Sequence, residues 1–268
     1  MKTRLITAAV GVPFLIFVLV VRGWFAELVI ALLTIIAMRE CYRALGKAGY
    51  NVCTWGGYAA AVAMWPLSRV MGVLDPLLLV VAAMGISMTG VMLREKPTFP
   101  DAAASVYPLF TCFLPMSMFM MMMNSTYGVV PGIALITMAF AIAYVGDGAA
   151  YFGGRAMGKH KLCPNVSPKK TVEGAIFGVV GGIIGGLICR AVFVYAFHMP
   201  MPGIPAAIAL GLIGSVAGEI GDLSASLLKR HSGIKDYGKI FPGHGGVMDR
   251  FDSVIFTLIV MYCYTLVL

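Results

Sequence analysis

Three carboxylates lie inside strongly apolar segments and are the first residues that could carry chemistry. Asp147 stands in the run AIAYVGDGAAYF, and Glu219 and Asp222 stand in GSVAGEIGDLSASLL. An ionisable group at membrane depth is costly, so it usually faces the protein interior or a water-filled cavity. The alternative explanation is a side chain that reaches the interface from a helix end, or an ion pair that only fixes packing.

Helical spacing joins these carboxylates to hydroxyl and cationic residues. Asp147, Tyr151 and Arg155 would share one helix face, since they are four residues apart. A second face would carry Asp222, Ser226, Lys229 and Arg230. Carboxylate and hydroxyl oxygens suit Mg²⁺, whereas Lys and Arg suit phosphate. The pattern predicts a metal–polyphosphate site at a membrane surface.

Two basic stretches, about 153–172 and 229–248, differ from the short connectors elsewhere. The second leads into Asp249 and Asp252, which would share a face at the start of the last helix. Its glycines would let backbone N–H groups approach an anion closely. Compensation of the helix dipole is the plainer explanation for a carboxylate at a helix start. The concentration of Gly, His, Asp and Arg favours a site.

The first stretch contains a near match to a nucleotide-binding P-loop, from Gly153 to Lys159. We reject that fold, because His160 stands where Ser or Thr is needed and the motif follows an apolar helix instead of a strand. Thr171 is a suitable N-cap for the next helix. Lys169 and Lys170 stand just before that helix N-terminus, a position that attracts phosphate. A basic loop that only sets topology is the alternative.

Composition indicates what must position these residues. Of the 268 residues, 60% are apolar and 12% are charged, and the mean hydropathy is +0.90. These values exclude an ordinary soluble globule, for which about 25% charged residues are typical. We expect an all-α, polytopic transmembrane helical bundle. About nine spans are expected, at roughly 5–21, 25–45, 56–73, 75–93, 102–123, 129–152, 173–197, 203–228 and 249–268.

The net charge of +8 fits this topology. With the N-terminus in the cytosol, 17 of the 20 Lys and Arg residues fall on the cytosolic side, as the positive-inside rule requires. We expect one integral membrane domain, in which 1–140 is a scaffold and 141–268 is the catalytic half. Glycines at every fourth residue from Gly174 to Gly186 would let helices pack closely, within the bundle or across a homodimer.

The C-terminal motifs are identified as those of a known family. The segment from Ser226 to Asp252 resembles the signature of the phosphatidate cytidylyltransferases, also called CDP-diacylglycerol synthases, without a departure from it. The signature positions are Ser226, Lys229, Arg230, Lys235, Asp236, Gly238, Phe241, Pro242, His244, Gly245, Gly246, Val247, Asp249, Arg250, Phe251 and Asp252. The upstream runs 147–155 and 167–174 are also similar to that family. The motifs cover about the last 120 residues, and the first 130 match only in hydrophobicity.

The resemblance implies a Mg²⁺-dependent nucleotidyl transfer in phospholipid biosynthesis. A phosphate oxygen of phosphatidic acid would attack the α-phosphorus of CTP, giving CDP-diacylglycerol and pyrophosphate. Metal ions can bridge phosphate oxygens and neutralise charge in such reactions. No covalent enzyme intermediate is needed, because the lipid phosphate is itself a nucleophile. Whether a second metal ion takes part is left open.

The resemblance also assigns roles to residues. Asp222 and Asp249 would be metal ligands, with Asp147 a weaker third. The triphosphate and the pyrophosphate would be held by Lys169, Lys170, Lys229, Arg230 and Lys235. His244 would orient a phosphate or protonate the leaving group, and Asp236 and Asp252 would orient neighbouring cations. The remaining residues expected at the substrate site are Tyr151, Arg155, Ser167, Ser226 and Arg250.

The expected partners are CTP, phosphatidic acid, membrane lipid and a second copy of the chain, with no role for nucleic acid. The site would face the cytosol from a bacterial plasma membrane. One alternative is a CTP-dependent kinase or cytidylyltransferase acting on another lipid, such as a polyprenol. A second alternative is an ion-coupled transporter using Asp147, Glu219 and Asp222, which leaves both basic loops unexplained. CDP-alcohol phosphatidyltransferases are rejected, because their Asp-Gly-x-x-Ala-Arg pattern is missing at Asp147.

Overall fold

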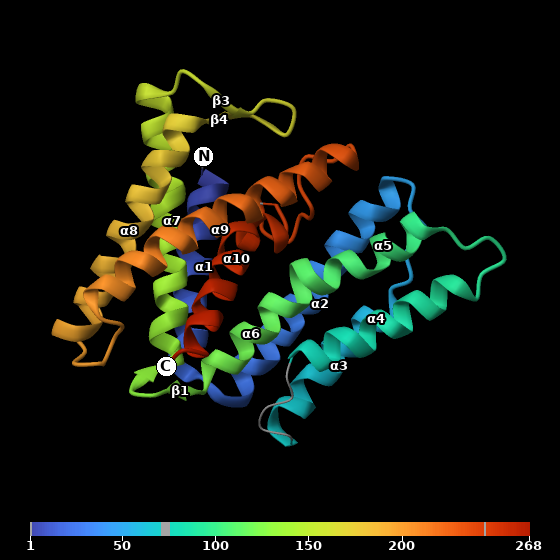
Figure 1. Cartoon of the computed structure of the whole chain (residues 1–268), viewed down its shortest axis with the longest axis horizontal. Helices are drawn as coiled ribbons and strands as arrows, with labels where there is room; N and C mark the ends of the chain where they lie inside the picture. Colours follow the sequence, from blue (N-terminus) through green and yellow to red (C-terminus); the bar gives the residue numbers. More distant parts are fainter. Residues whose placement is uncertain (1, 71–75, 244) are drawn as a thin grey trace. The chain divides into compact units, whose positions relative to one another are not determined.

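A computed structural model describes residues 2–70, 76–243 and 245–268. These residues are mostly helical and form two compact units, which are described separately (Figure 1). Unit 1 comprises residues 1–121 and 228–251, and unit 2 comprises residues 122–227 and 252–268. The chain passes from one unit to the other within α6, α9 and α10. The expected division into a scaffold, 1–140, and a catalytic half, 141–268, is one of function and stays a prediction.

Unit 1 is built from the N-terminal helices. They are α1 (Lys2–Val21), α2 (Gly23–Lys47), α3 (Trp55–Val70), α4 (Pro76–Met92), α5 (Phe99–Pro108), the π-helical turn η1 (Leu109–Phe113) and α6 (Leu114–Met123). The expected single helix at 102–123 is therefore interrupted. Pro108 has no N–H to donate, and a wide π turn directly follows it. Thr98 caps the start of α5 by accepting a hydrogen bond from the N–H of Asp101.

Unit 2 contains the remaining elements. They are β1 (Thr126–Tyr127), β2 (Val130–Pro131), α7 (Gly132–Met157), β3 (Lys161–Cys163), β4 (Ser167–Thr171), α8 (Val172–Tyr195), α9 (Ile204–His231) and α10 (Met248–Thr265). The short strands form two antiparallel hairpins, β1–β2 and β3–β4, which the all-α expectation did not include. The β3–β4 hairpin follows α7 and leads into α8, and Figure 1 shows it at one end of this helix pair.

Each expected apolar segment is largely helical where the structure describes it, although the segment 129–152 begins with the strand β2. Four helical stretches among the described residues are long and apolar enough to cross a membrane: Phe99–Met123, Gly132–Met157, Val172–Tyr195 and Ile204–His231. These helices support a membrane protein. The count of about nine spans and the cytosolic N-terminus stay predictions.

Glycines let α7 and α8 lie against each other within unit 2. The six glycines of α8 from Gly174 to Gly186 are buried. A Cβ at Gly185 would come within 2.6 Å of the Ala141 carbonyl oxygen, and one at Gly178 would press on Ala150. The expected close packing of small residues is therefore confirmed within the bundle. Its use in a homodimer stays a prediction.

Thr171 and Glu173 fasten the β3–β4 hairpin to the start of α8. The Thr171 side chain accepts a hydrogen bond from the N–H of Gly174 at 3.1 Å, which confirms the predicted N-cap. The Glu173 carboxylate accepts hydrogen bonds from the N–H groups of Lys159 and His160. Because both ends of the hairpin are tied to this turn, the position of Lys169 and Lys170 is set by α8.

The packing of α7 on α8 can be tested by substitution. We expect Gly185→Ala to lower the free energy of unfolding by about 1–3 kcal/mol, because the added methyl meets backbone that cannot rotate away. The measurement is the thermal unfolding midpoint in detergent. Gly148→Ala on α7 is the matched control, since no atom of the described part of the chain lies within 4 Å of its added Cβ. Equal midpoints for the two variants would contradict the packing argument.

Candidate active site

A lysine of the hairpin holds two carboxylates of α9 within unit 2. Lys170 Nζ lies 2.7 Å from Glu219 Oε1 and 2.6 Å from Asp222 Oδ2. The three side chains keep between 21 and 26% of their surface exposed. Glu219 and Asp222 are three residues apart on one helix, so their carboxylates lie on the same face. The cation between them offsets the repulsion of two acids that are largely removed from solvent.

Burial and charge act in opposite directions on Lys170. Burial lowers the pKa of the ammonium group, but the nearby Asp222 and Glu219 carboxylates raise it. The net effect is a pKa above the usual value for lysine, so Lys170 is cationic at neutral pH.

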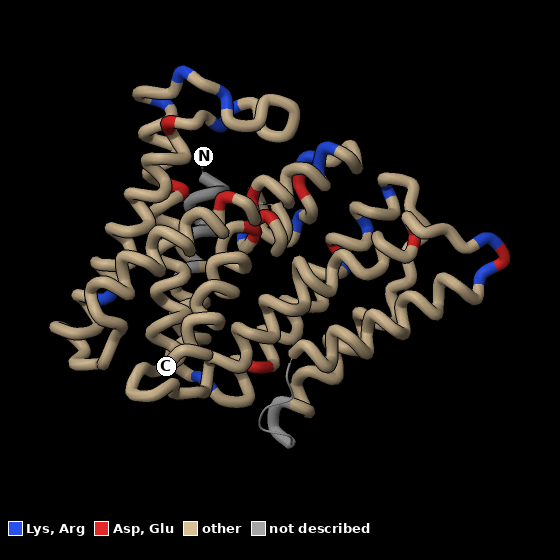
Figure 2. Tube along the Cα trace, in the orientation of Figure 1, with Lys and Arg blue, Asp and Glu red and all other residues tan. Residues whose placement is uncertain are grey.

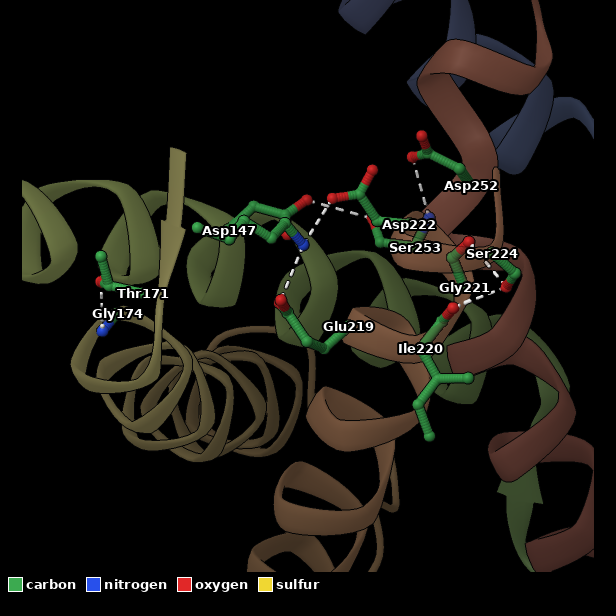
Figure 3. A network of polar contacts seen from close by, with 11 residues as sticks. Asp147, Thr171, Gly174, Glu219, Ile220, Gly221, Asp222, Ser224, Asp252 and Ser253 are labelled. Carbon is green, nitrogen blue, oxygen red and sulfur yellow. Dashed lines mark hydrogen bonds and ion pairs between the residues drawn. The ribbon is translucent and has the colours of Figure 1, made fainter. Parts of the chain in front are cut away.

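Asp147 joins this group from α7. Ser253 Oγ donates a hydrogen bond to Asp147 Oδ2 at 3.0 Å, and the N–H of Ser253 donates to Asp252 Oδ1. In Figure 3 the carboxylates of Asp147, Glu219 and Asp222 point toward one another from α7 and α9. Within unit 2, therefore, three carboxylates and one ammonium meet next to the N-terminal turn of α8.

Two cavities adjoin this cluster within unit 2. A cavity of about 340 Å³, which we call the polar cavity, has polar side chains in its wall, among them Tyr151, Arg155, Lys169 and Lys170. A second cavity, of about 300 Å³, is lined mainly by apolar residues of α7, α8 and α9. Asp147 and Glu219 belong to the lining of both. The two cavities therefore share a wall that contains the carboxylates of Asp147 and Glu219. This arrangement suits a ligand with a charged head and an apolar tail.

Several cationic residues lie near the polar cavity. Lys169 is exposed beside the buried Thr171. Arg155 stands one turn after Tyr151 on α7 and donates a hydrogen bond to the Tyr151 hydroxyl at 3.5 Å. Figure 2 shows basic residues along the β3–β4 hairpin, and the sequence makes them lysines. This hairpin gives the cavity a positively charged rim, which would attract phosphate.

Unit 1 contains a second polar cluster, centred on Asp249. Lys229 Nζ lies 3.0 Å from Asp249 Oδ1, and the Asp249 side chain is only 4% exposed. Asp249 Oδ2 accepts hydrogen bonds from the N–H of Tyr237 at 2.7 Å and of Gly246 at 2.9 Å. Both carboxylate oxygens therefore have partners, which offsets the cost of burying the charge.

Glu40 of α2 belongs to this second cluster and was not predicted. It is 5% exposed, and its Oε2 accepts a hydrogen bond from the N–H of Met248 at 3.0 Å. Arg43, one turn later on α2, donates a hydrogen bond to the Tyr237 carbonyl. The sequence did contain a signal for this site, namely that Glu40 and Arg43 lie three residues apart at the end of an apolar helix. No local motif connects them to a segment 200 residues later.

The predicted site residues thus fall into groups. Unit 2 brings together Asp147, Lys170 and Asp222, and adds Glu219 and Ser253, which the prediction had not assigned to the site. Unit 1 pairs Lys229 with Asp249. Arg230, Lys235, Asp236 and Arg250 are exposed, and Ser167 and Ser226 are partly exposed. His244 lies outside the described residues.

The residues present fit a magnesium ion that is held jointly with its substrate. Among the described residues, no three His, Cys, Asp or Glu side chains are placed to bind a metal ion by themselves. Mg²⁺ usually takes one or two carboxylates and completes its shell with water and substrate phosphates. Asp222 and Asp147 can supply such a pair of oxygens within unit 2.

Comparisons with known proteins agree with the motifs. Phosphatidate cytidylyltransferase of Staphylococcus epidermidis is 43% identical over 127 residues, which cover 47% of this chain and 47% of that protein. The protein of that name from Bacillus subtilis is 43% identical over 131 residues, covering 49% of this chain and 47% of the relative. The match spans about half the length of each of these relatives.

A family-wide comparison covers nearly the whole chain. The model of the cytidylyltransferase family matches residues 2–268, which include both polar clusters and the N-terminal helices. On this evidence, the chain belongs to the cytidylyltransferase family.

Proposed function

We propose that this protein is a phosphatidate cytidylyltransferase, which converts CTP and phosphatidic acid to CDP-diacylglycerol and pyrophosphate. The lipid phosphate oxygen forms a bond to the α-phosphorus of CTP, while the bond from that phosphorus to the bridging oxygen of pyrophosphate breaks. The observation that carries the proposal is the carboxylate–lysine cluster of Asp147, Lys170, Glu219 and Asp222, two members of which, Asp147 and Glu219, line both the polar and the apolar cavity. The name carried by the bacterial relatives supports it.

Each of the two cavities suits one of the two proposed substrates. The triphosphate of CTP would lie in the polar cavity, where Lys169, Lys170 and Arg155 provide cations. The glycerol and first acyl carbons of phosphatidic acid would lie in the apolar cavity, with the lipid phosphate at the wall formed by Asp147 and Glu219. Holding both reactants in this way lowers the entropic cost of their encounter.

Charge balance supports a magnesium ion at the carboxylate cluster. Three carboxylates face one ammonium in unit 2, a formal excess of two negative charges. When bound there, Mg²⁺ would neutralise phosphate charge and orient the reacting groups. Asp222 and Asp147 are the ligands that these contacts favour. Asp249, in unit 1, is proposed as a metal ligand from the family motif alone.

The other predicted residues are proposed to act through charge and hydrogen bonding. Lys229, Arg230, Lys235 and Arg250 would stabilise the triphosphate and the departing pyrophosphate, as cations do in phosphoryl transfer. Ser167, Ser226 and Tyr151 would donate hydrogen bonds to phosphate oxygens. His244 would orient a phosphate or protonate the leaving group. Lys170 would hold Asp222 and Glu219 in place until the nucleotide binds.

The surroundings of the enzyme are also part of the proposal. Its long apolar helices and its bacterial relatives support a multi-pass protein of the bacterial plasma membrane. Because CTP is cytosolic, the basic β3–β4 hairpin would face the cytosol, in line with the positive-inside rule. A homodimer is proposed from the sequence alone, because the buried glycines of α8 are already used in packing within unit 2.

The first test is turnover of radiolabelled CTP with phosphatidic acid by the purified chain in detergent. We expect labelled CDP-diacylglycerol in the presence of Mg²⁺ and none after its removal with a chelator. Polyprenol and diacylglycerol as acceptors distinguish the related lipid-directed activities. Absence of any CDP-lipid with every divalent ion tried, together with ion flux into proteoliposomes, would reject the proposal in favour of a transporter.

Asp222→Asn tests the metal assignment. We expect the rate to fall by about 100-fold or more, which corresponds to about 2.7 kcal/mol of barrier. The amide removes one negative charge from the pair that Lys170 holds. Glu95→Gln, at an exposed acid outside both clusters, is the matched control and should leave the rate unchanged. A normal rate for folded Asp222→Asn would remove this residue from the metal site.

The neighbouring lysines should give different kinetic results. Lys169 is exposed at the polar cavity, so Lys169→Ala should raise the KM for CTP about 10-fold, as expected for the loss of one phosphate contact. Lys170 also holds two carboxylates, so Lys170→Ala should lower kcat as well. Both constants are measured by varying CTP at saturating lipid. Identical behaviour of the two variants would contradict the separate roles.

A further inference from the structure

Glu40 is a buried carboxylate that none of the proposed chemistry uses. Its Oε2 accepts the hydrogen bond from Met248, at the first residue of α10. Its Oε1 is buried and has no hydrogen-bond partner among the residues that the structure describes. A buried carboxylate oxygen without a partner carries a free-energy cost. Such a cost is retained where the residue performs a task that an apolar residue cannot perform.

Two glycines of the 237–248 segment are explained by Glu40. A Cβ at Gly238 or at Gly246 would overlap Glu40 Oε1. Neither glycine has a positive φ, in contrast to Gly243 and Gly245 in the same segment, at 76° and 88°. Alanine would therefore suit the backbone conformation at both positions. At Gly246 the Glu40 side chain excludes it, and at Gly238 the Cα of Gly246, 2.8 Å from the added Cβ, is a second obstacle. For Gly246, the three atoms nearest to the added Cβ all belong to Glu40.

Helix α2 thus holds both ends of this segment. Arg43 binds the carbonyl of Tyr237 at one end, and Glu40 binds the N–H of Met248 at the other. Asp249 follows directly, and its Oδ2 accepts hydrogen bonds from Tyr237 and from Gly246. Any shift of the segment away from α2 would move these two donors and with them the Asp249 carboxylate.

We propose that Glu40 is a positioning residue for the nucleotidyl transfer. It fixes the backbone at Gly238 and from Gly246 to Met248, so that Asp249 is held ready beside Lys229. The N-terminal half of the chain thereby contributes to the reaction through α2. The inference rests on the proposed function, because it assumes that Asp249 and Lys229 take part in that reaction.

Four variants test the role of Glu40. Glu40→Ala removes the acceptor for the Met248 N–H, whereas Glu40→Gln keeps an acceptor of the same size. Gly246→Ala adds one methyl group that displaces the carboxylate. The double variant Glu40→Ala/Gly246→Ala has space for that methyl group. Glu27→Gln is the matched control, since Glu27 is also a buried acid of α2, 8% exposed, and lies outside both clusters.

We expect Glu40→Ala and Gly246→Ala each to lower kcat about 30-fold, which corresponds to an activation barrier raised by about 2 kcal/mol. The KM for CTP should change by less than about 3-fold. Glu40→Gln should keep most of the rate, and Glu27→Gln should keep all of it. In the double variant kcat should fall about 30-fold. Two independent effects would multiply to a loss of roughly 1,000-fold, but here both changes remove the same contact.

Hydrogen exchange of the backbone from 237 to 249 gives a second readout that does not depend on turnover. It should become faster in Glu40→Ala and Gly246→Ala but not in Glu27→Gln. Normal kcat with faster exchange would show a purely structural role and overturn the proposal, as would multiplicative losses in the double variant. A wild-type protein without CTP turnover would refute the proposed function. Unchanged exchange in both variants would refute the inference alone.

Discussion

The constraint on which the site depends is that carboxylates among apolar helices must be paired. Lys170 meets this requirement for Glu219 and Asp222, with both ion pairs shorter than 3 Å. Without the lysine, two acids three residues apart on α9 would repel each other where little water can screen them. The lysine reaches them from a strand, so the β3–β4 hairpin must be held close to α9 within unit 2. Much of the packing in unit 2 serves to hold the β3–β4 hairpin near α9.

Glycine packing and helix capping together position the lysine. The buried glycines of α8 let this helix lie against α7, which carries Asp147. Thr171 caps α8 and ends β4, so the residue just before the cap, Lys170, has a fixed direction. The Glu173 carboxylate ties the other end of the hairpin through backbone N–H groups. Local interactions worth about 1 kcal/mol each therefore determine where a charged group stands.

Much of this arrangement could be predicted from the sequence, because it depends on local rules. Apolar runs predicted the helical segments, Thr171 was identified as an N-cap, and Asp147 and Asp222 were singled out as acids among apolar residues. The short hairpins and the interruption of the helix at Pro108 were not predicted, since strands of two to five residues have no clear periodicity. The role of Glu40 could not be predicted, because its contacts with Gly246 and Met248 depend on tertiary structure and involve residues more than 200 positions away. The glycines of that segment were interpreted as space for an anion, and for Gly238 and Gly246 the space is filled by Glu40.

The two polar clusters balance their charges in different ways, and this difference bears on their roles. Asp249 has a lysine and two backbone N–H groups, so its negative charge is already compensated in the protein alone. Asp147, Glu219 and Asp222 share one lysine, so their cluster keeps an excess of negative charge next to a cavity with a cationic rim. A cation would balance that excess, and a triphosphate would balance the rim, so each ligand makes the binding of the other more favourable. The cluster of Asp147, Glu219 and Asp222, whose charge is balanced only when ligands bind, suits the reacting centre. Asp249, whose charge is already compensated by the protein, suits a preorganised group.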